Sequence, residues 1–226
     1  MEYFILAGYK VISFDKISST QDYAHDMVVH GDAGDHTVVV ANAQYAGRGR
    51  YRRKWVSHHG NLYTSFIFLS PERDPRLSYA VAVAIADTIM SFGVNPQIKW
   101  PNDILIDGKK VAGTLIEYAG RFAIVGIGIN VATNPTVQEY TTTKLLDYTK
   151  VDLNELFARL TKNMDKWLRA EFDSVRRFWM NCAIGLNGLV KYRGEMVEMI
   201  GINDNGSLVV RRASEYFLIH GDEVLI

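Results

Sequence analysis

The sequence changes character near residues 181–188, and this change constrains the fold more than any other feature of the chain. Before it, apolar runs typical of strands alternate with amphipathic stretches typical of helices. After it, short β-type runs are separated by glycine and asparagine turns and show no helical period. We therefore expect an α+β domain over residues 1–182, with helices packed on a mixed β-sheet, and a small β domain of the barrel type over residues 183–226.

Three helices are expected in the first domain. Hydroxyl residues at Ser18 to Thr20 favour a helix start, with Gln21 three residues after Ser18 as in a capping box, and Gly31 favours the end. An alanine-rich stretch is apolar on nearly every face, and a later stretch follows the capping residue Asp152 with apolar residues at helical spacing. The helices should cover residues 20–30, 76–92 and 153–167.

Strand signals fill most of the remaining first domain. The Asp107-Gly108 pair favours a hairpin between two of these strands. The threonine-rich residues 133–149 are expected to form a surface connection. Strands are expected up to residue 14 and at residues 38–43, 61–70, 98–100, 104–106, 110–118 and 121–131.

The segment Gly47 to Trp55 reads Gly-Arg-Gly-Arg-Tyr-Arg-Arg-Lys-Trp and directly follows a buried strand. Its glycines free the backbone to turn its N–H groups toward a ligand, and its guanidinium groups match phosphate or carboxylate oxygens. Gln44 stands three residues earlier, where its amide can face the same cavity. A solvated charge run or a nucleic-acid contact is the alternative, but a position at a strand end favours a small-ligand site for an anion.

A second motif, Lys-Trp-Pro-Asn-Asp at residues 99–103, is followed by Lys-Lys-Val-Ala-Gly at residues 109–113. Proline and asparagine place a tight turn here, so Asp103 and a lysine of the returning strand can approach one site. An ordinary hairpin rim with surface charges is the alternative. Such a lysine would stabilise charge that develops on a phosphate.

The segment Gly126 to Asn130 reads Gly-Ile-Gly-Ile-Asn but lacks the third glycine and the helix of a dinucleotide-binding fingerprint. Its glycines are better explained by a ligand that lies close to the backbone, with Asn130 bonded to a ring or ribose. The six histidines lack the spacing of metal ligands, so we expect no structural zinc.

Composition limits the partners. The 25 basic residues balance the 25 acidic ones, which argues against broad binding to DNA or to membranes. The single cysteine, Cys182, suits a reducing compartment and reads as an inert apolar residue. The N-terminus lacks a signal peptide and no segment approaches a membrane span, so we expect a cytoplasmic protein.

Together these motifs resemble those of biotin protein ligases, the enzymes that join biotin to a lysine of carboxylase carrier domains. The resemblance covers nearly the whole chain. It implies the catalytic fold of that family, which is similar to class II synthetases, and an SH3-like form for the C-terminal barrel. The chain leaves no room for the helix-turn-helix of the family's repressors, so a ligase without repressor activity is expected. Many relatives have glycine at the position of Arg52, so the path of the loop can differ here.

The resemblance also implies roles for residues. Catalysis would fall to Lys110, Arg48, Arg50 and Asp103. Biotin would be bound by Ser19, Thr20, Gln44, Gly47, Arg48, Arg50, Lys110 and Gly113. ATP, with Mg²⁺, would be bound by Arg50, Arg53, Trp55, Lys110 and Asn130, and no protein metal site is implied. The partner would be the biotin carboxyl carrier protein of acetyl-CoA carboxylase or a related carboxylase, and a homodimer is favoured.

Two other functions remain open from the sequence. Lipoate ligation or transfer uses a similar fold, although the two motifs favour biotin. A non-catalytic RNA-binding module could use Arg48 to Trp55, and it would bind single strands with steep salt dependence and consume no ATP.

Overall fold

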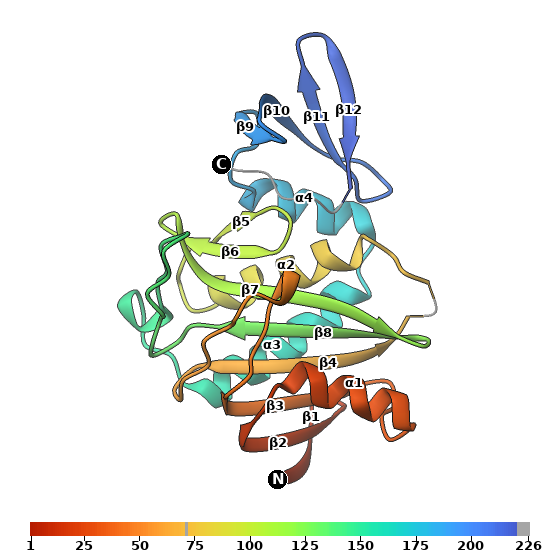
Figure 1. Ribbon diagram of the computed structural model, residues 1–226, viewed down its shortest axis with the longest axis vertical. Coiled ribbons are helices and arrows are strands. Elements are labelled where there is room, and N and C mark those ends of the chain that lie inside the picture. Colours follow the sequence, from red (N-terminus) through yellow and green to blue (C-terminus); the bar gives the residue numbers. More distant parts are fainter. Residues whose placement is uncertain (71, 221–226) are drawn as a thin grey trace.

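A mixed eight-stranded sheet forms the centre of the molecule, with the strand order β1-β2-β3-β4-β8-β7-β6-β5 (Figure 1). The computed structural model describes residues 1–70 and 72–220. Strands β2 and β3 pair in parallel, and the other neighbours pair antiparallel. The strands are β1 (Glu2–Leu6), β2 (Tyr9–Ile17), β3 (Thr37–Gln44), β4 (Leu62–Leu69), β5 (Gln97–Lys99), β6 (Asp103–Ile106), β7 (Lys109–Ala119) and β8 (Phe122–Ile129). The predicted α+β class with a mixed sheet is confirmed.

Helices cover both faces of this sheet (Figure 1). Helix α1 (Thr20–His30) packs Ala24 and Met27 on one face, and helix α2 (Leu77–Met90) packs on the other, with α3 (Leu153–Leu168) against it. Helix α2 lies between the sheet and α3, which explains why nearly all of its residues are apolar and buried. No helix among the described residues combines the length and apolar character needed to cross a bilayer.

The predicted helix signals are confirmed with one change. Helix α1 begins and ends where expected, with Gly31 in the left-handed conformation, but its N-cap is Ser19 rather than Ser18. The Oγ of Ser19 accepts a hydrogen bond from the backbone N–H of Asp22. Asp152 caps α3 by accepting from the N–H of Glu155 at 2.9 Å. The side chain of Gln21 is therefore free to turn into the protein rather than back to the helix start.

Two elements differ from the sequence prediction. The first predicted strand is a hairpin of β1 and β2, which turns at Ala7 and Gly8 in the left-handed region. Helix α4 (Phe172–Cys182) is not predicted. The apolar residues Phe172, Val175, Phe178 and Trp179 recur at helical spacing, so the sequence carries a signal for α4 that the prediction did not use.

The C-terminal strands form a separate antiparallel sheet in the order β12-β11-β10-β9. They are β9 (Leu189–Tyr192), β10 (Glu195–Ile202), β11 (Leu208–Arg212) and β12 (Glu215–Ile219). Closure into an SH3-like barrel is not confirmed among the described residues, and residues 221–226 of the predicted β domain lie outside them. The domain boundary between residues 182 and 183 stays a prediction.

Successive residues of β8 point alternately to the two faces of the sheet, so that one set belongs to the core and the other faces α1. Val125, Ile127 and Ile129 point to the α2 face and belong to the main core. Gly126 and Gly128 point to the α1 face, where side chains of other elements approach their backbone closely. At Gly126 and Gly128, β8 thus has no side chain on the α1 face, and this leaves room for side chains of other elements.

Candidate active site

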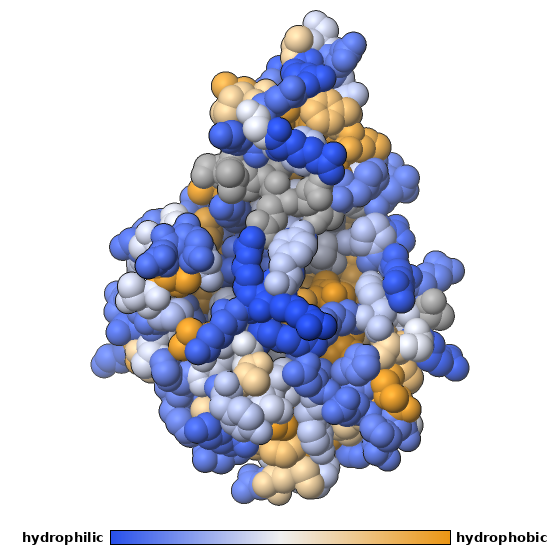
Figure 2. All heavy atoms as spheres, viewed as in Figure 1, coloured by the Kyte–Doolittle hydropathy of each residue, from blue (hydrophilic) through white to orange (hydrophobic). Residues whose placement is uncertain are grey.

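A cavity of about 670 Å³ lies on the α1 face of the sheet, within the size range of small-ligand sites. The start of α1, the end of β3, the loop after β3, the β5–β6 turn and strands β7 and β8 form its walls. Figure 2 shows strongly hydrophilic side chains in a band across the middle of one face of the molecule. The predicted residues that line the cavity are Ser19, Thr20, Gln44, Arg48, Arg50, Arg53, Trp55, Asp103, Lys110 and Gly113.

Two predicted site residues are not in this lining. Gly47 is buried in the loop, where a Cβ would lie 2.6 Å from Ser57 Oγ and 2.7 Å from the carbonyl oxygen of Trp55. Asn130 is buried below the connection after β8, and its Nδ2 donates to the carbonyl of Thr143 at 3.1 Å. The described residues leave the Asn130 Oδ1 without a hydrogen-bond partner. Gly47 therefore contributes to packing within the loop, and Asn130 contributes to holding the connection after β8.

One wall is built from neutral polar groups. The Oε1 of Gln44 accepts from the backbone N–H of Thr20 at 2.8 Å and from its hydroxyl at 3.2 Å. The Oγ of Ser65 lies 3.0 Å from the Oγ1 of Thr20, and the Nε2 of Gln44 donates to Ser57 at 2.9 Å. Ser19 and Thr20 are almost fully buried. This wall offers both donors and acceptors without a net charge.

The loop after β3 folds back on itself as a narrow flap. Isolated β-bridges join Arg48 to Lys54 and Gln44 to Ser57. Its base, residues 47–48, is called the loop root, and residues 50–53 are called the loop tip. The tip forms a single 3₁₀ turn in which Tyr51 and Arg52 have φ values of 56° and 57°. Glycine reaches this region without the steric cost of a side chain, so Tyr51 and Arg52 carry that cost at the tip.

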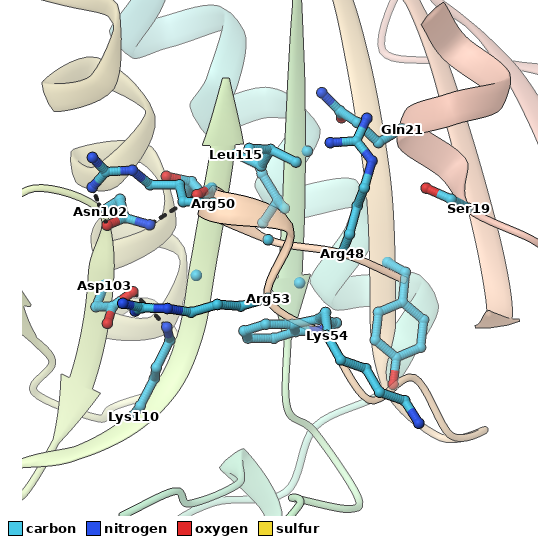
Figure 3. Close-up of a pocket in the computed structure, with 18 of the residues that line it drawn as sticks. Ser19, Gln21, Arg48, Arg50, Arg53, Lys54, Asn102, Asp103, Lys110 and Leu115 are labelled. Atoms are coloured by element: carbon cyan, nitrogen blue, oxygen red, sulfur yellow. Dashed lines mark hydrogen bonds and ion pairs between the residues drawn. The ribbon is translucent and has the colours of Figure 1, made fainter. Parts of the chain in front are cut away.

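The tip reaches across the cavity to the β5–β6 turn (Figure 3). The Nη1 of Arg50 donates to the Oδ1 of Asn102 at 3.1 Å, and the Nδ2 of Asn102 donates to the carbonyl of Thr114 at 3.0 Å. The guanidinium groups of Arg50 and Arg53 lie 5.1 and 5.6 Å from the ring centroid of Tyr51. Asn102 and Tyr51 thus help to orient Arg50 across the cavity.

Lys110 and Asp103 meet on the opposite wall, as the hairpin predicted. The Nζ of Lys110 lies 2.6 Å from Asp103 Oδ1, and the Lys110 side chain is 13% exposed (Figure 3). The ammonium group also lies 5.4 Å from the ring centroid of Trp55 and 4.9 Å from that of Tyr140. A half-buried ammonium between aromatic rings and a carboxylate is held in one place.

Trp55 lies along the floor of the cavity, over two glycines. A Cβ on Gly128 would lie 2.5 Å from its indole ring, and a Cβ on Gly113 would lie 3.2 Å from it. The described residues give the buried indole Nε1 no hydrogen-bond partner. Close approach of Trp55 requires glycine at positions 113 and 128, whereas the sequence predicted that a ligand lies close to the backbone of β8.

Arg48 points differently from Arg50. Its guanidinium lies beside Asp22 of α1 and Glu117 of β7 and forms ion pairs with both carboxylates at 2.7 Å. In Figure 3 its side chain extends toward Gln21, away from Arg50. The loop root and the loop tip therefore place their cations in two separate environments.

Several lining residues were not singled out from the sequence. Tyr140 and Glu139 come from the connection after β8, which was expected only to lie on the surface. Burial, with Asp103 and Glu139 nearby, raises the pKa of Tyr140, so its hydroxyl stays protonated at neutral pH. No motif marks this threonine-rich segment. Pairing of Lys110 with Thr142 is what brings Tyr140 over the lysine.

Metal ligands are sparse around the cavity. Over residues 1–70 and 72–220, no group of three or more His, Cys, Asp or Glu side chains is arranged to hold a metal ion. Asp103 and Glu139 are the carboxylates among the cavity-lining residues. Magnesium is often held by one or two carboxylates together with substrate phosphates, so this donor set suits an ion that arrives with a nucleotide.

The chemistry of the cavity follows from its two walls. Arg50, Arg53 and Lys110 can bind and neutralise anionic groups, and the wall of Thr20 and Gln44 can bind a neutral polar group. Lysine and arginine charges that surround two anions lower the repulsion between them. The cavity is therefore suited to join a carboxylate to a phosphate.

Known proteins share both the sequence and the fold. Residues 13–134 match the model of the Biotin/lipoate A/B protein ligase family. The Bifunctional ligase/repressor BirA of Bacillus subtilis is 32% identical, over 90% of this chain and 70% of its own length. The Biotin--[acetyl-CoA-carboxylase] ligase of Paracoccus denitrificans is 31% identical, over 82% of this chain and 88% of its own length.

A solved structure agrees with these relatives. The biotin protein ligase from Aquifex aeolicus in complex with biotin and ATP superposes with a TM-score of 0.84 at 25% identity, over 95% of this chain and 97% of that chain. The matched family region contains the loop after β3, the β5–β6 turn and Lys110, which together form most of the cavity. The chain belongs to the biotin/lipoate A/B protein ligase family.

Proposed function

We propose that the protein is an ATP-dependent biotin protein ligase. It joins biotin to ATP as biotinyl-5'-adenylate and then transfers the biotinyl group to a lysine of a biotin carboxyl carrier domain. The observation that carries the proposal is that three cations, Arg50, Arg53 and Lys110, share one cavity with the neutral wall of Thr20 and Gln44. The relatives named as biotin ligases support it.

In the first step the biotin carboxylate attacks the α-phosphorus of ATP, and pyrophosphate leaves. Both reactants are anionic, so the step needs positive charge on each side of the forming bond. Lys110 projects from β7 and Arg50 from the loop tip, and their charged groups lie beside the adjacent residues Asp103 and Asn102 of the β5–β6 turn. Arg53 adds a third charge near the tip, where it would bind the phosphates.

Biotin itself would lie along the neutral wall. Its ureido ring has both N–H donors and a carbonyl acceptor, which match the hydroxyl groups of Ser19 and Thr20 and the amide of Gln44. Gly113 has no side chain to obstruct the floor. ATP would take the side of Lys110 and Trp55, with Asn130 supporting the connection that carries Tyr140.

Magnesium belongs to the proposal as a companion of ATP. Asp103 and Glu139 offer carboxylate oxygens near the predicted phosphate position. When bound, the ion would supply further positive charge to the phosphates. The chain's own residues would hold the nucleotide and keep the tip closed over it.

In the second step the carrier lysine attacks the acyl carbon of the adenylate, and AMP leaves. The amine must lose a proton first, because the ordinary pKa of lysine is about 10.4. Asp103 lies next to Lys110 at the rim of the cavity and would orient or assist the incoming amine. Asp103→Asn should slow transfer more than adenylate formation, and equal rates of transfer in the two proteins would remove Asp103 from this step.

Assembly and location complete the proposal. A homodimer would form through the exposed edge strand β1, where Tyr3 and Ile5 are more than half exposed. The single cysteine suits a reducing compartment such as the cytoplasm. The carrier would be that of acetyl-CoA carboxylase or a related carboxylase.

The decisive experiment supplies labelled biotin, ATP, Mg²⁺ and a biotin carboxyl carrier domain to the wild-type protein. Label on the carrier that requires ATP is expected, with the Lys110→Ala protein as a blank. A parallel reaction supplies lipoate and a lipoyl domain. Label on the lipoyl domain and none on the biotin carrier would make the protein a lipoate ligase instead.

A further inference from the structure

Arg48 binds two carboxylates at the edge of the cavity. Its Nε donates to Asp22 Oδ1 at 2.8 Å, its Nη1 donates to Glu117 Oε1 at 2.7 Å, and its Nη2 donates to Glu117 Oε2 at 2.8 Å. The Nη2 also lies 2.7 Å from Asp22 Oδ1. All three nitrogens of the guanidinium are used by protein carboxylates, so little of it is left for a ligand.

The protonation states agree with this geometry. Burial alone would raise the pKa of Glu117, but hydrogen bonds from Arg48 and Gln21 and the charge of Arg48 outweigh it and lower the pKa below its usual value. Hydrogen bonding to Glu117 raises the pKa of Arg48 further. The contact is therefore a charged one at neutral pH.

This contact differs from an ordinary surface ion pair. Exposed pairs contribute between nothing and about 1 kcal/mol, because water screens them and the two side chains lose conformational entropy. Here the Arg48 side chain is 25% exposed and Glu117 is 33% exposed, and the two meet in a two-pronged geometry with Asp22 as a third member. Such paired geometry is stronger and directional.

The contact also leads back to the neutral wall of the cavity. The Nε2 of Gln21 donates to Glu117 Oε2 at 3.0 Å and to the carbonyl of Ile124 at 3.1 Å. The Oγ of Ser65 lies 3.0 Å from Gln21 Oε1 and 3.0 Å from Thr20 Oγ1. Gly126 leaves room for this path, since a Cβ there would lie 2.6 Å from Gln21 Oε1. Gln21, which is also bonded to Ile124 of the sheet, thus holds Glu117 independently of Arg48.

We propose that Glu117 and Asp22 are positioning residues that anchor the loop root through Arg48, and so determine how firmly the loop tip closes over the adenylate. The inference rests on the proposed function, since the adenylate is the intermediate of that reaction. The side chain of Arg48 would then hold the loop, in place of the catalytic role that the sequence predicts for it. Neither carboxylate touches a substrate.

Trypsin tests the anchor without any ligand, because the loop tip and its neighbour carry Arg50, Arg52, Arg53 and Lys54. Glu117→Gln keeps the shape of the side chain and removes its charge, and it should speed cleavage in the folded protein by about tenfold. Asp22→Asn should have a smaller effect in the same direction. The matched control is Asp26→Asn, which changes an exposed carboxylate of α1 outside the contact and should leave the rate unchanged.

The second measurement is retention of biotinyl-adenylate by the protein. Glu117→Gln should release the adenylate about tenfold faster than wild type, and the charge exchange Arg48→Glu with Glu117→Arg should recover part of the loss, which a general loss of stability would not allow. If Glu117→Gln does not fold, Asp22→Asn decides by the same two measurements. An unchanged cleavage rate and unchanged retention of the adenylate in a folded variant would contradict the proposal that these carboxylates anchor the loop root.

The two proposals fail in different ways. A wild-type protein that makes no adenylate from biotin and ATP contradicts the proposed function, and the cleavage test still decides whether the carboxylates anchor the loop. A wild-type protein that makes and holds the adenylate, with variants that behave like it, contradicts the anchor alone.

Discussion

The root and the tip of one loop place their arginines against different parts of the protein. At the root, Arg48 binds two carboxylates and is partly buried. At the tip, two residues later, Arg50 is oriented by the neutral Asn102 and by Tyr51, on a backbone with two left-handed residues. Arg48 thus ties the root to α1 and β7, whereas Arg50 ties the tip to the β5–β6 turn. The partner of a cation, rather than its position in a motif, thus indicates its role.

The largest expected effect tests whether the arginines of the loop tip can support adenylate formation without Lys110. Lys110→Ala removes the ammonium that lies beside Asp103, and adenylate formation should fall by about a hundredfold or more because one side of the reacting anions loses its counter-charge. Pyrophosphate release from biotin and ATP measures this. Near-normal release would mean that the tip arginines alone are sufficient.

The next effect concerns the tip itself. Arg50→Gly removes the contact with Asn102, so the flap should hold the adenylate less well, by about tenfold. Labelling of bystander proteins by released adenylate should rise accordingly. Retention equal to wild type would show that the root alone keeps the loop closed.

A smaller effect concerns the root and depends on pH. The pKa of Glu117 is lowered in the folded protein, so its pairing stabilises the fold above the unfolded pKa of about 4.3 and the contribution is lost as pH falls through the lower folded value. Urea unfolding of wild type and Glu117→Gln at pH 7 and at pH values below 4 measures it. The difference in unfolding free energy should be about 1 kcal/mol at pH 7, because the pair has a two-pronged geometry but is partly exposed, and should shrink in acid. A difference that is the same at both pH values would contradict the charged contact.

The smallest effect concerns the backbone of the tip. Arg52 has a φ of 57°, so Arg52→Gly should be more stable than Arg52→Ala by about 1 kcal/mol, since only alanine keeps the Cβ that is strained there. The comparison with alanine removes the effect of losing the charge. Thermal unfolding of the two variants measures it, and an alanine variant of equal stability would mean that the tip is not left-handed in solution.

Local patterns predicted much of the architecture. The caps Asp152 and Gly31, the Asp107-Gly108 turn and the apolar stretches led to three of the four helices and to the strands of the large sheet, because these signals act within a few residues. Helix α4 was missed although its apolar residues, among them Val175 and Trp179, lie at helical spacing. The predicted barrel depends on pairing between distant strands, and such pairing has no short-range signal.

For the site, the residue types were determined by the sequence and their partners by the tertiary structure. The two motifs named Arg50, Asp103 and Lys110, and the structure brings them to one cavity. Nothing in the sequence indicates that Glu117, 69 residues from Arg48, takes the charge of the first loop arginine, or that Tyr140 lies over Lys110. Charge and hydrogen-bonding capacity belong to each side chain, but how they are used depends on which groups the sheet and its connections bring within about 3 Å of it.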